Sequence, residues 1–312
     1  MGPLTRRSFV GTLAAAATVN RLRLEHEIHA LVLGSVQDGG LPQTGCYTPR
    51  CNRARTKPRY VASLALIEPA AQRFYLVDAT PDITRQIDLI AASGFRRRAA
   101  ARRPFDGMFL THAHIGHYLG LALLGREGLG IARTPCYSSA SMATFLAENA
   151  PWSLLVKEGR LELHPLEFDR WHRIDEYLAV KLLAVPHRHE FSDTVAFVFR
   201  GPSRSLLYLP DIDGWNKWDR SVESVVSGVD AALLDGSFYS ATEVPGRRHE
   251  DIPHPLIPDT MELLQGAVRA GHEIVFTHLN NTNVALDADS PERAQITQRG
   301  FDVAREGMRF EL

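Results

Sequence analysis

The chain has 312 residues, with 35 basic and 36 acidic side chains, and its formal net charge is −1. This balance offers no net attraction to a phosphate backbone or an anionic lipid surface, which argues against nucleic acid as a partner, and no run of about 20 apolar residues predicts a membrane span. A globular chain of this length buries enough surface to fold without a structural metal, so we expect any bound metal to serve chemistry.

Residues 1–25 have the layout of a twin-arginine export signal. An arginine pair precedes Ser8 and Phe9, and the uncharged stretch 11–19 follows. We therefore expect export to the periplasm, with 26–312 forming one domain. The alternative is the basic N-terminus of a cytoplasmic protein.

Strand and helix patterns alternate along the first half of the chain. A proline at the helix start and isoleucines at helical spacing predict a helix over 80–92, and a second helix is expected over 139–149. A group of arginines within 96–103 is expected to lie in a solvated loop. Short apolar runs that end at polar residues predict strands over 30–34, 61–68, 74–78 and 107–111.

Two cysteines, Cys46 and Cys51, are separated by four intervening residues in a stretch rich in glycine and proline, and Cys136 stands alone. The spacing is compatible with a disulfide in an oxidising compartment, with half of a zinc site, or with two half-buried loop residues. The sequence leaves these alternatives open.

Strand and helix patterns also alternate along the second half of the chain. Helices are expected over 259–270 and 291–299, and Trp215 and Trp218 fit an amphipathic helix as core residues. Without a linker that divides the chain, these elements predict an α/β (α+β) sandwich of two mixed sheets with helices outside each. The predicted strands, of which the first pairs with its successors as an antiparallel meander, are 178–185, 194–200, 205–209 and 231–234.

The strongest chemical signal follows the apolar run 108–110. His112 and His114 project to the same side of an extended backbone, and His117 can turn back to the same point where a helix begins. Neutral imidazole is a preferred ligand of zinc, so this spacing predicts a metal site.

Other ligand-type residues close later strands. His187, Asp211 and His278 each follow an apolar run, and loops at one edge of a sheet stack are where a rigid scaffold presents chemistry. His189 and Asp213 lie two residues beyond two of these positions and are the alternative ligands. We prefer the residues nearest the strand ends and expect the other two to orient imidazoles.

This pattern resembles the metallo-β-lactamase fold superfamily, an αββα sandwich with metal at one edge. Segments 33–43, 277–283 and 287–293 resemble the branch of the pyrroloquinoline quinone (PQQ) biosynthesis protein B. The resemblance implies a first metal position and a second one. Its ligands would be His112, His114, His187 and Asp211 for the first metal, with His117 and His278 toward the second.

The chain departs from the superfamily at Gly116, where aspartate is common and supplies an oxygen to the second metal. Glycine cannot coordinate a metal through a side chain. We therefore expect one tightly held zinc and a weak or empty second position, and we expect aspartate at position 116 to raise occupancy there.

A zinc with an open position suits hydrolysis of an ester, lactone, amide or phosphodiester bond in a small-molecule substrate, with Asp211 both binding metal and accepting a proton. The resemblance also implies an alternative, in which iron supports oxidation of a tyrosine-derived precursor. A non-catalytic binding or carrier protein is the third possibility. Metal identity discriminates the first two.

Further candidates surround this centre. His254 stands between prolines and is assigned a catalytic or pocket role. Asp38 and Gln43, in a glycine-rich loop, are expected to border the substrate pocket. Asn280 follows His278 and fits either a pocket residue or a turn residue.

Overall fold

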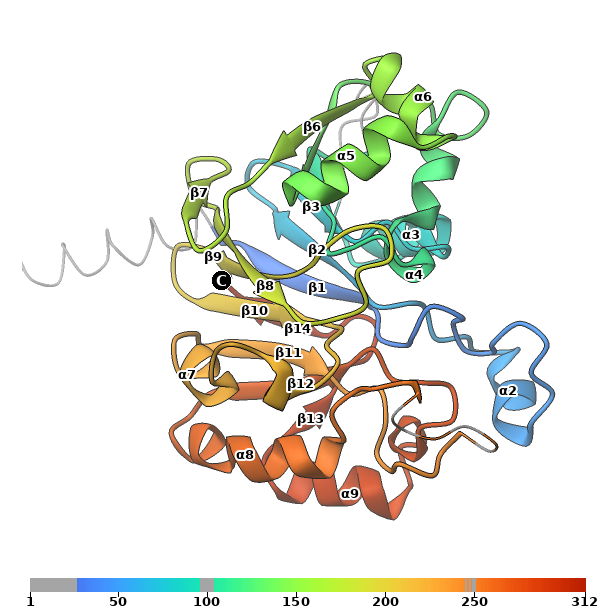
Figure 1. Ribbon diagram of the computed structural model, residues 1–312, viewed down its shortest axis with the longest axis vertical. Coiled ribbons are helices and arrows are strands. Elements are labelled where there is room, and N and C mark those ends of the chain that lie inside the picture. Colours follow the sequence, from blue (N-terminus) through green and yellow to red (C-terminus); the bar gives the residue numbers. More distant parts are fainter. Residues whose placement is uncertain (1–26, 96–103, 245, 247, 249–250) are drawn as a thin grey trace, which may run out of the picture.

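Two seven-stranded mixed sheets pack face to face, and helices cover their outer sides, as the superfamily resemblance predicts (Figure 1). This computed structural model describes residues 27–95, 104–244, 246, 248 and 251–312. The proposed export signal at 1–25 and the arginine-rich loop at 96–103 lie outside the described residues. No helix within the described ranges is long and apolar enough to cross a membrane.

The first sheet has the order β14-β1-β2-β3-β4-β5-β6, antiparallel from β14 to β3 and parallel from β3 to β6. The four strands predicted in the first half are confirmed as β1 to β4, whereas β5, β6 and β14 were not predicted. The bounds are β1 His29–Gly34, β2 Ser63–Glu68, β3 Arg73–Val77, β4 Gly107–Phe109, β5 Thr134–Ser138, β6 Leu161–Pro165 and β14 Arg309–Glu311.

The second sheet has the order β13-β12-β11-β10-β9-β8-β7. Its strands β7 to β10 pair antiparallel, which confirms the predicted meander, and β10 to β13 pair parallel. The bounds are β7 Trp171–Arg173, β8 Ala179–Val185, β9 Thr194–Arg200, β10 Ser205–Leu209, β11 Ala231–Asp235, β12 Glu273–Thr277 and β13 Asp302–Val303.

Helices lie on the outer face of each sheet (Figure 1). The first sheet is covered by α3, α4, α5 and α6 with the 3₁₀ helix η1, and the second by α7, α8 and α9; α3, α5, α8 and α9 are the helices that the sequence predicts. The bounds are α2 Pro49–Ala54, α3 Ile83–Ala92, α4 Ile115–Tyr118, η1 Leu119–Leu124, α5 Ala140–Glu148, α6 Trp152–Lys157, η2 Trp215–Lys217, α7 Val222–Val226, α8 Ile257–Arg269, η4 Val284–Leu286 and α9 Pro291–Gln298.

The predicted helix around Trp215 and Trp218 is wrong, because only the single 3₁₀ turn η2 forms there. Trp218 is nevertheless buried in the core of the second sheet, and its indole N–H donates to the carbonyl of Ala184. The indole N–H of Trp215 donates to Thr260. Both tryptophans therefore anchor this loop to the core, as their apolar character indicates.

A cluster of aromatic rings lies where the two sheets meet. Phe109 of β4 is fully buried, and its ring centroid lies 5.1 Å from those of Tyr137 and Phe199 and 5.5 Å from that of Phe197. Every residue of β9 from Thr194 to Phe199 is also buried, as expected for a strand covered on both faces. This packing fixes the strand ends from which the site is built.

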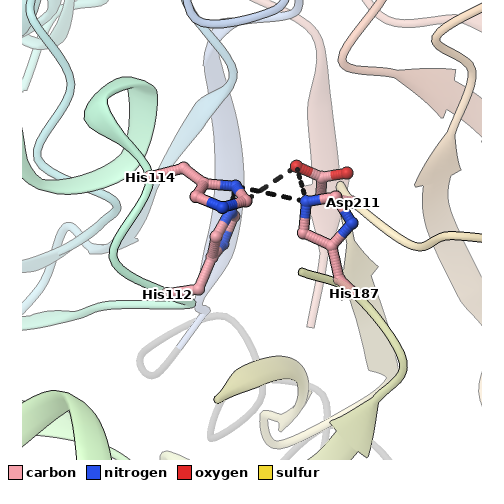
Figure 2. A group of neighbouring side chains, drawn as sticks. All are labelled: His112, His114, His187 and Asp211. Atoms are coloured by element: carbon pink, nitrogen blue, oxygen red, sulfur yellow. Dashed lines mark hydrogen bonds and ion pairs between the residues drawn. The ribbon is translucent and has the colours of Figure 1, made fainter. Parts of the chain in front are cut away.

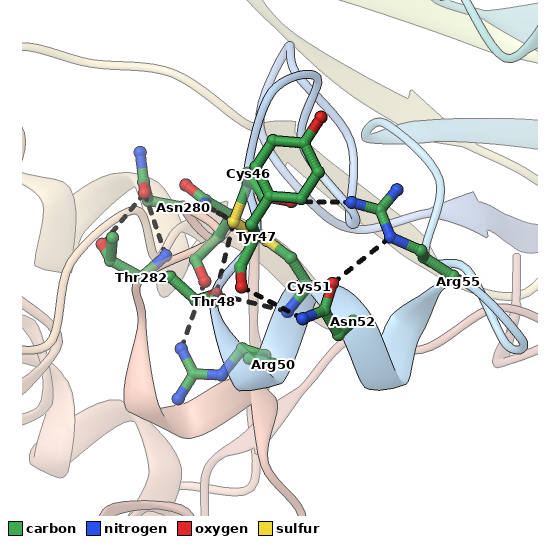
Figure 3. Close-up of a disulfide and its surroundings, with 10 residues drawn as sticks. Cys46, Tyr47, Thr48, Arg50, Cys51, Asn52, Arg55, Asn280 and Thr282 are labelled. Atoms are coloured by element: carbon green, nitrogen blue, oxygen red, sulfur yellow. Dashed lines mark hydrogen bonds between the residues drawn. A yellow bond between two sulfur atoms is a disulfide. The ribbon is translucent and has the colours of Figure 1, made fainter.

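Cys46 and Cys51 form a disulfide, which decides between the three interpretations of their spacing (Figure 3). Arg50, between them, donates to the carbonyls of Asn281 and Asn283 and to the carboxylate of Asp287. The disulfide-bonded loop is therefore held against the segment that follows β12.

Candidate metal centre

Four strands deliver polar side chains to one edge of the sandwich. His112 follows β4, His187 follows β8, Asp211 follows β10 and His278 follows β12. Carboxyl ends of parallel strands commonly present ligand-binding residues at one sheet edge, and here both sheets contribute. The structure thus brings these four strand ends together at one edge.

The first group comprises His112, His114, His187 and Asp211 (Figure 2). His114 Nδ1 lies 2.9 Å from His112 Nε2 and 3.2 Å from His187 Nε2. Asp211 Oδ2 lies 3.2 Å from His187 Nε2 and 3.5 Å from His112 Nε2. One donor atom from each residue lies within 4.8 Å of the others, a span that one metal ion can bridge.

The second group comprises Asp38, His117 and His278. The Nε2 atoms of the two histidines are 3.3 Å apart, and Asp38 Oδ1 lies 3.6 Å from His117 and 3.7 Å from His278. Asp211 Oδ2 is 3.8 Å from His278 Nε2, so that this carboxylate lies between the two groups.

Hydrogen bonds orient the imidazole rings through the ring nitrogen that points away from the metal group. His187 Nδ1 donates to Asp213 over 2.8 Å, and His117 Nδ1 donates to Asp78 over 2.7 Å. Thr111 Oγ1 lies 3.0 Å from His112 Nδ1 and donates to Asp78 as well. Such partners fix the ring orientation and leave the opposite nitrogen free to bind a metal.

Neither of the two alternative ligands, His189 and Asp213, belongs to the first group. Asp213 stands behind His187, as expected for an orienting partner, and His189 is exposed. Geometry therefore favours His187 and Asp211 as the ligating pair.

The donor set fits a divalent cation. His187 directs its Nδ1 at Asp213 and its Nε2 at Asp211 Oδ2, and these two atoms repel unless a proton or a metal cation lies between them. The buried oxygens Asp38 Oδ1 and Asp211 Oδ1 accept no hydrogen bond from the described residues. Imidazole nitrogen with carboxylate oxygen suits zinc or iron.

The pKa values follow from burial and charge. Burial opposes a charge on His117, but the carboxylate of Asp78 outweighs it and raises the pKa of His117 to about 9. Burial favours the neutral form of Asp211, but the imidazoles of His278 and His187 outweigh it and hold its pKa well below the usual range. The carboxylate is thus ionised, and a cation at His117 must displace a proton.

Two residues of the centre have strained backbones. Asp78 and His278 adopt φ angles of 64° and 60°, in the left-handed region. Residues with a side chain are uncommon there, and the cost is roughly 1–3 kcal/mol each. Such strain is typical of functional sites, and here it points both side chains at the centre.

A cavity of about 500 Å³ adjoins both groups. The predicted pocket residues Asp38, Gln43 and Asn280 line it together with Asp211 and His278. Asn280 is also a turn residue, because its side-chain oxygen accepts from the backbone N–H that follows two residues later. Asn280 therefore both lines the cavity and stabilises a turn.

His254 lies beside the centre. Its Nδ1 donates to Asp235 over 2.8 Å and lies 3.4 Å from Asp211 Oδ1. Burial disfavours its charged form, but the Asp235 carboxylate outweighs burial and raises the pKa of His254 to about 9. The imidazole is therefore placed to hold or release a proton next to Asp211.

Three acidic residues of the centre were not predicted from the sequence: Asp78, Asp235 and Glu190. Asp78 directly follows β3 and Asp235 ends β11, so their places at strand ends were an available signal. Glu190, whose Oε2 lies 3.1 Å from His114 Nε2, is exposed in a loop and carries no such signal.

Replacing Asp213 with alanine is expected to weaken metal binding at the first group by about 10–100-fold while leaving the number of bound ions unchanged, because Asp213 orients His187 without ligating. Competition with a metal-binding dye measures the affinity. The control is the exposed Asp219→Ala. Complete loss of one ion per chain in Asp213→Ala would show that Asp213 is itself a ligand.

Comparisons with known proteins agree with this geometry. The model of the beta-lactamase superfamily domain matches residues 73–279. Coenzyme PQQ synthesis protein B from Methylorubrum populi is 28% identical over 91% of this chain and all of that protein, and the one from Azotobacter vinelandii is equally similar.

Solved structures show the same fold. The crystal structure of Zn²⁺-bound PqqB from Methylobacterium extorquens has a TM-score of 0.75 and 25% identity, covering 91% of this chain and 100% of that one. A diphosphatase from the PhnP family shares the fold, with a TM-score of 0.62 and 20% identity over 92% of this chain and 97% of that one. The chain therefore belongs to the beta-lactamase superfamily, with the metallo-β-lactamase fold, and within it resembles PqqB.

Proposed function

We propose that this protein is a metal-dependent hydrolase of a small molecule, and that the first group holds zinc. The observation that carries the proposal is the convergence of three imidazole nitrogens and the Asp211 carboxylate beside a cavity large enough for a small substrate. Membership of the superfamily and the zinc named for the related PqqB structure support it.

A divalent cation in this site would lower the pKa of a water molecule to about 7 and polarise a carbonyl or phosphoryl oxygen of the substrate. The protein's own residues would carry out the proton transfers. Asp211 Oδ1, which accepts no hydrogen bond from the described residues, is free to take a proton from the attacking water. His254, held by Asp235, is placed to return a proton to the leaving group. Ester, lactone, amide and phosphodiester bonds all meet these requirements.

A second function is favoured by the relatives named for coenzyme PQQ synthesis, which this chain matches over 91% of its length. In that case the same histidines would hold iron, and the reaction would be an oxidation with dioxygen. Each of the two groups contains at least two histidines and one carboxylate, the ligand types that hold iron in such oxidative sites.

Elemental analysis of protein purified without added metal tests both functions. About one or two zinc ions per chain, with hydrolysis of a nitrophenyl phosphodiester, ester or lactone that a chelator abolishes, would support the hydrolase. Iron together with substrate-dependent oxygen consumption would support the oxidative function instead. Protein that binds neither metal after reconstitution would overturn both.

A further inference from the structure

The space that a side chain would fill at Gly116 is occupied by Asp38. A Cβ atom added to Gly116 would lie 2.1 Å from Asp38 Oδ1 and 2.8 Å from Asp38 Cα, distances at which atoms overlap. Only glycine at position 116 lets the loop that follows β1 approach the start of α4 this closely.

The carboxylate that enters this space faces two imidazoles. Asp38 Oδ1 lies 3.6 Å from His117 Nε2 and 3.7 Å from His278 Nε2, and both histidines are buried. The oxygen itself is buried and accepts no hydrogen bond from the described residues, although the rest of the Asp38 side chain reaches the cavity. A buried carboxylate oxygen without a hydrogen bond is costly unless a cation or proton compensates it.

His117 is oriented to present a lone pair at the same point. Its Nδ1 donates to the fully buried Asp78 carboxylate, so Nε2 faces His278 Nε2 and Asp38 Oδ1. Two nitrogens and one carboxylate oxygen thus surround one small volume next to Asp211 Oδ2.

We infer that Asp38, together with His117 and His278, binds a second divalent cation. From the loop after β1, Asp38 supplies the carboxylate oxygen that Gly116 cannot supply. The inference deepens the proposed function and rests on it, because the carboxylate of Asp211 would lie between the second cation and the first. Zinc, iron and manganese are the ions that this nitrogen and oxygen set favours. The loss of a ligand at Gly116 therefore does not by itself weaken the second position.

The same geometry reverses the expectation for aspartate at position 116. In the native chain, Gly116→Asp would place its side chain against Asp38 and displace it, so occupancy of the second position should fall. The clash does not depend on the Asp38 carboxylate alone, because the Cα of residue 38 would also lie 2.8 Å from the added Cβ.

Stepwise titration of metal-free protein with Co²⁺, followed by absorption and by elemental counting, tests the inference. We expect two ions to bind to native protein and to Asp88→Ala, an exposed carboxylate on α3. In Asp38→Ala the first ion should remain, whereas the affinity for the second should fall by at least about 100-fold.

Retention of the first ion shows that the variants are folded, and Asp38→Asn provides a second, isosteric test. Native-like binding of two ions by Asp38→Ala, or binding of only one by native protein, would overturn the inference. Absence of both ions from native protein would instead refute the proposed function, so the two failures are distinguishable.

Discussion

Replacing both His112 and His114 with alanine is expected to abolish tight metal binding at the first group and to lower metal-dependent hydrolysis by at least about 1000-fold. The two residues supply two of the four donor atoms that lie within 4.8 Å of one another, and His187 with Asp211 cannot complete the shell of a metal ion. Loss of the several kcal/mol that a catalytic metal contributes corresponds to this change in rate. Metal content after dialysis against a weak chelator is the primary measurement.

The matched control is His189→Ala, which removes an exposed histidine near the same site and should leave metal content unchanged. A thermal unfolding curve shows whether the double variant is folded. Near-native metal content in the folded double variant would refute the assignment of these ligands.

Replacing Phe109 with alanine is expected to lower the free energy of unfolding by about 3–5 kcal/mol. The ring is fully buried between the sheets and contacts four other aromatic rings, those of Tyr75, Tyr137, Phe197 and Phe199. Its removal leaves a cavity that the neighbouring rings cannot fill, since they belong to strands on both sides. Urea unfolding, followed by tryptophan fluorescence, measures the loss.

The control for this prediction is Phe191→Ala. That ring is 63% exposed, and its removal should change the free energy of unfolding by no more than about 0.5 kcal/mol. Similar unfolding midpoints for the two variants would contradict the role assigned to the aromatic cluster.

The sequence predicts the long central strands well, because their high apolar content makes their composition distinctive. The runs that became β8, β9 and β10 are rich in apolar residues and end at turns, so both their extent and their pairing are evident. The short strands β7, β13 and β14 lack such runs. They form because a neighbouring strand offers unpaired backbone groups, which a local pattern does not reveal.

The same distinction applies to the metal centre. His112, His114 and His117 lie within six residues of one another, and their spacing alone indicates a common target. Asp38 reaches that target from a loop far away in the sequence, and its proximity to Gly116 depends on how the loop after β1 packs against α4. The missing side chain at Gly116 and the carboxylate of Asp38 are therefore related only in the folded structure.

The pairing of β14 with β1 has a consequence for biosynthesis. Arg309–Glu311 pair with His29–Leu31, so the two strands are far apart in the chain and the partner of β1 is synthesised long after it. Until then β1 has an unpaired edge, and such edges are templates for association with other chains. The edge of β1 therefore stays exposed in the nascent protein until β14 is synthesised, and we expect termination before Arg309 to yield aggregated rather than partly active product.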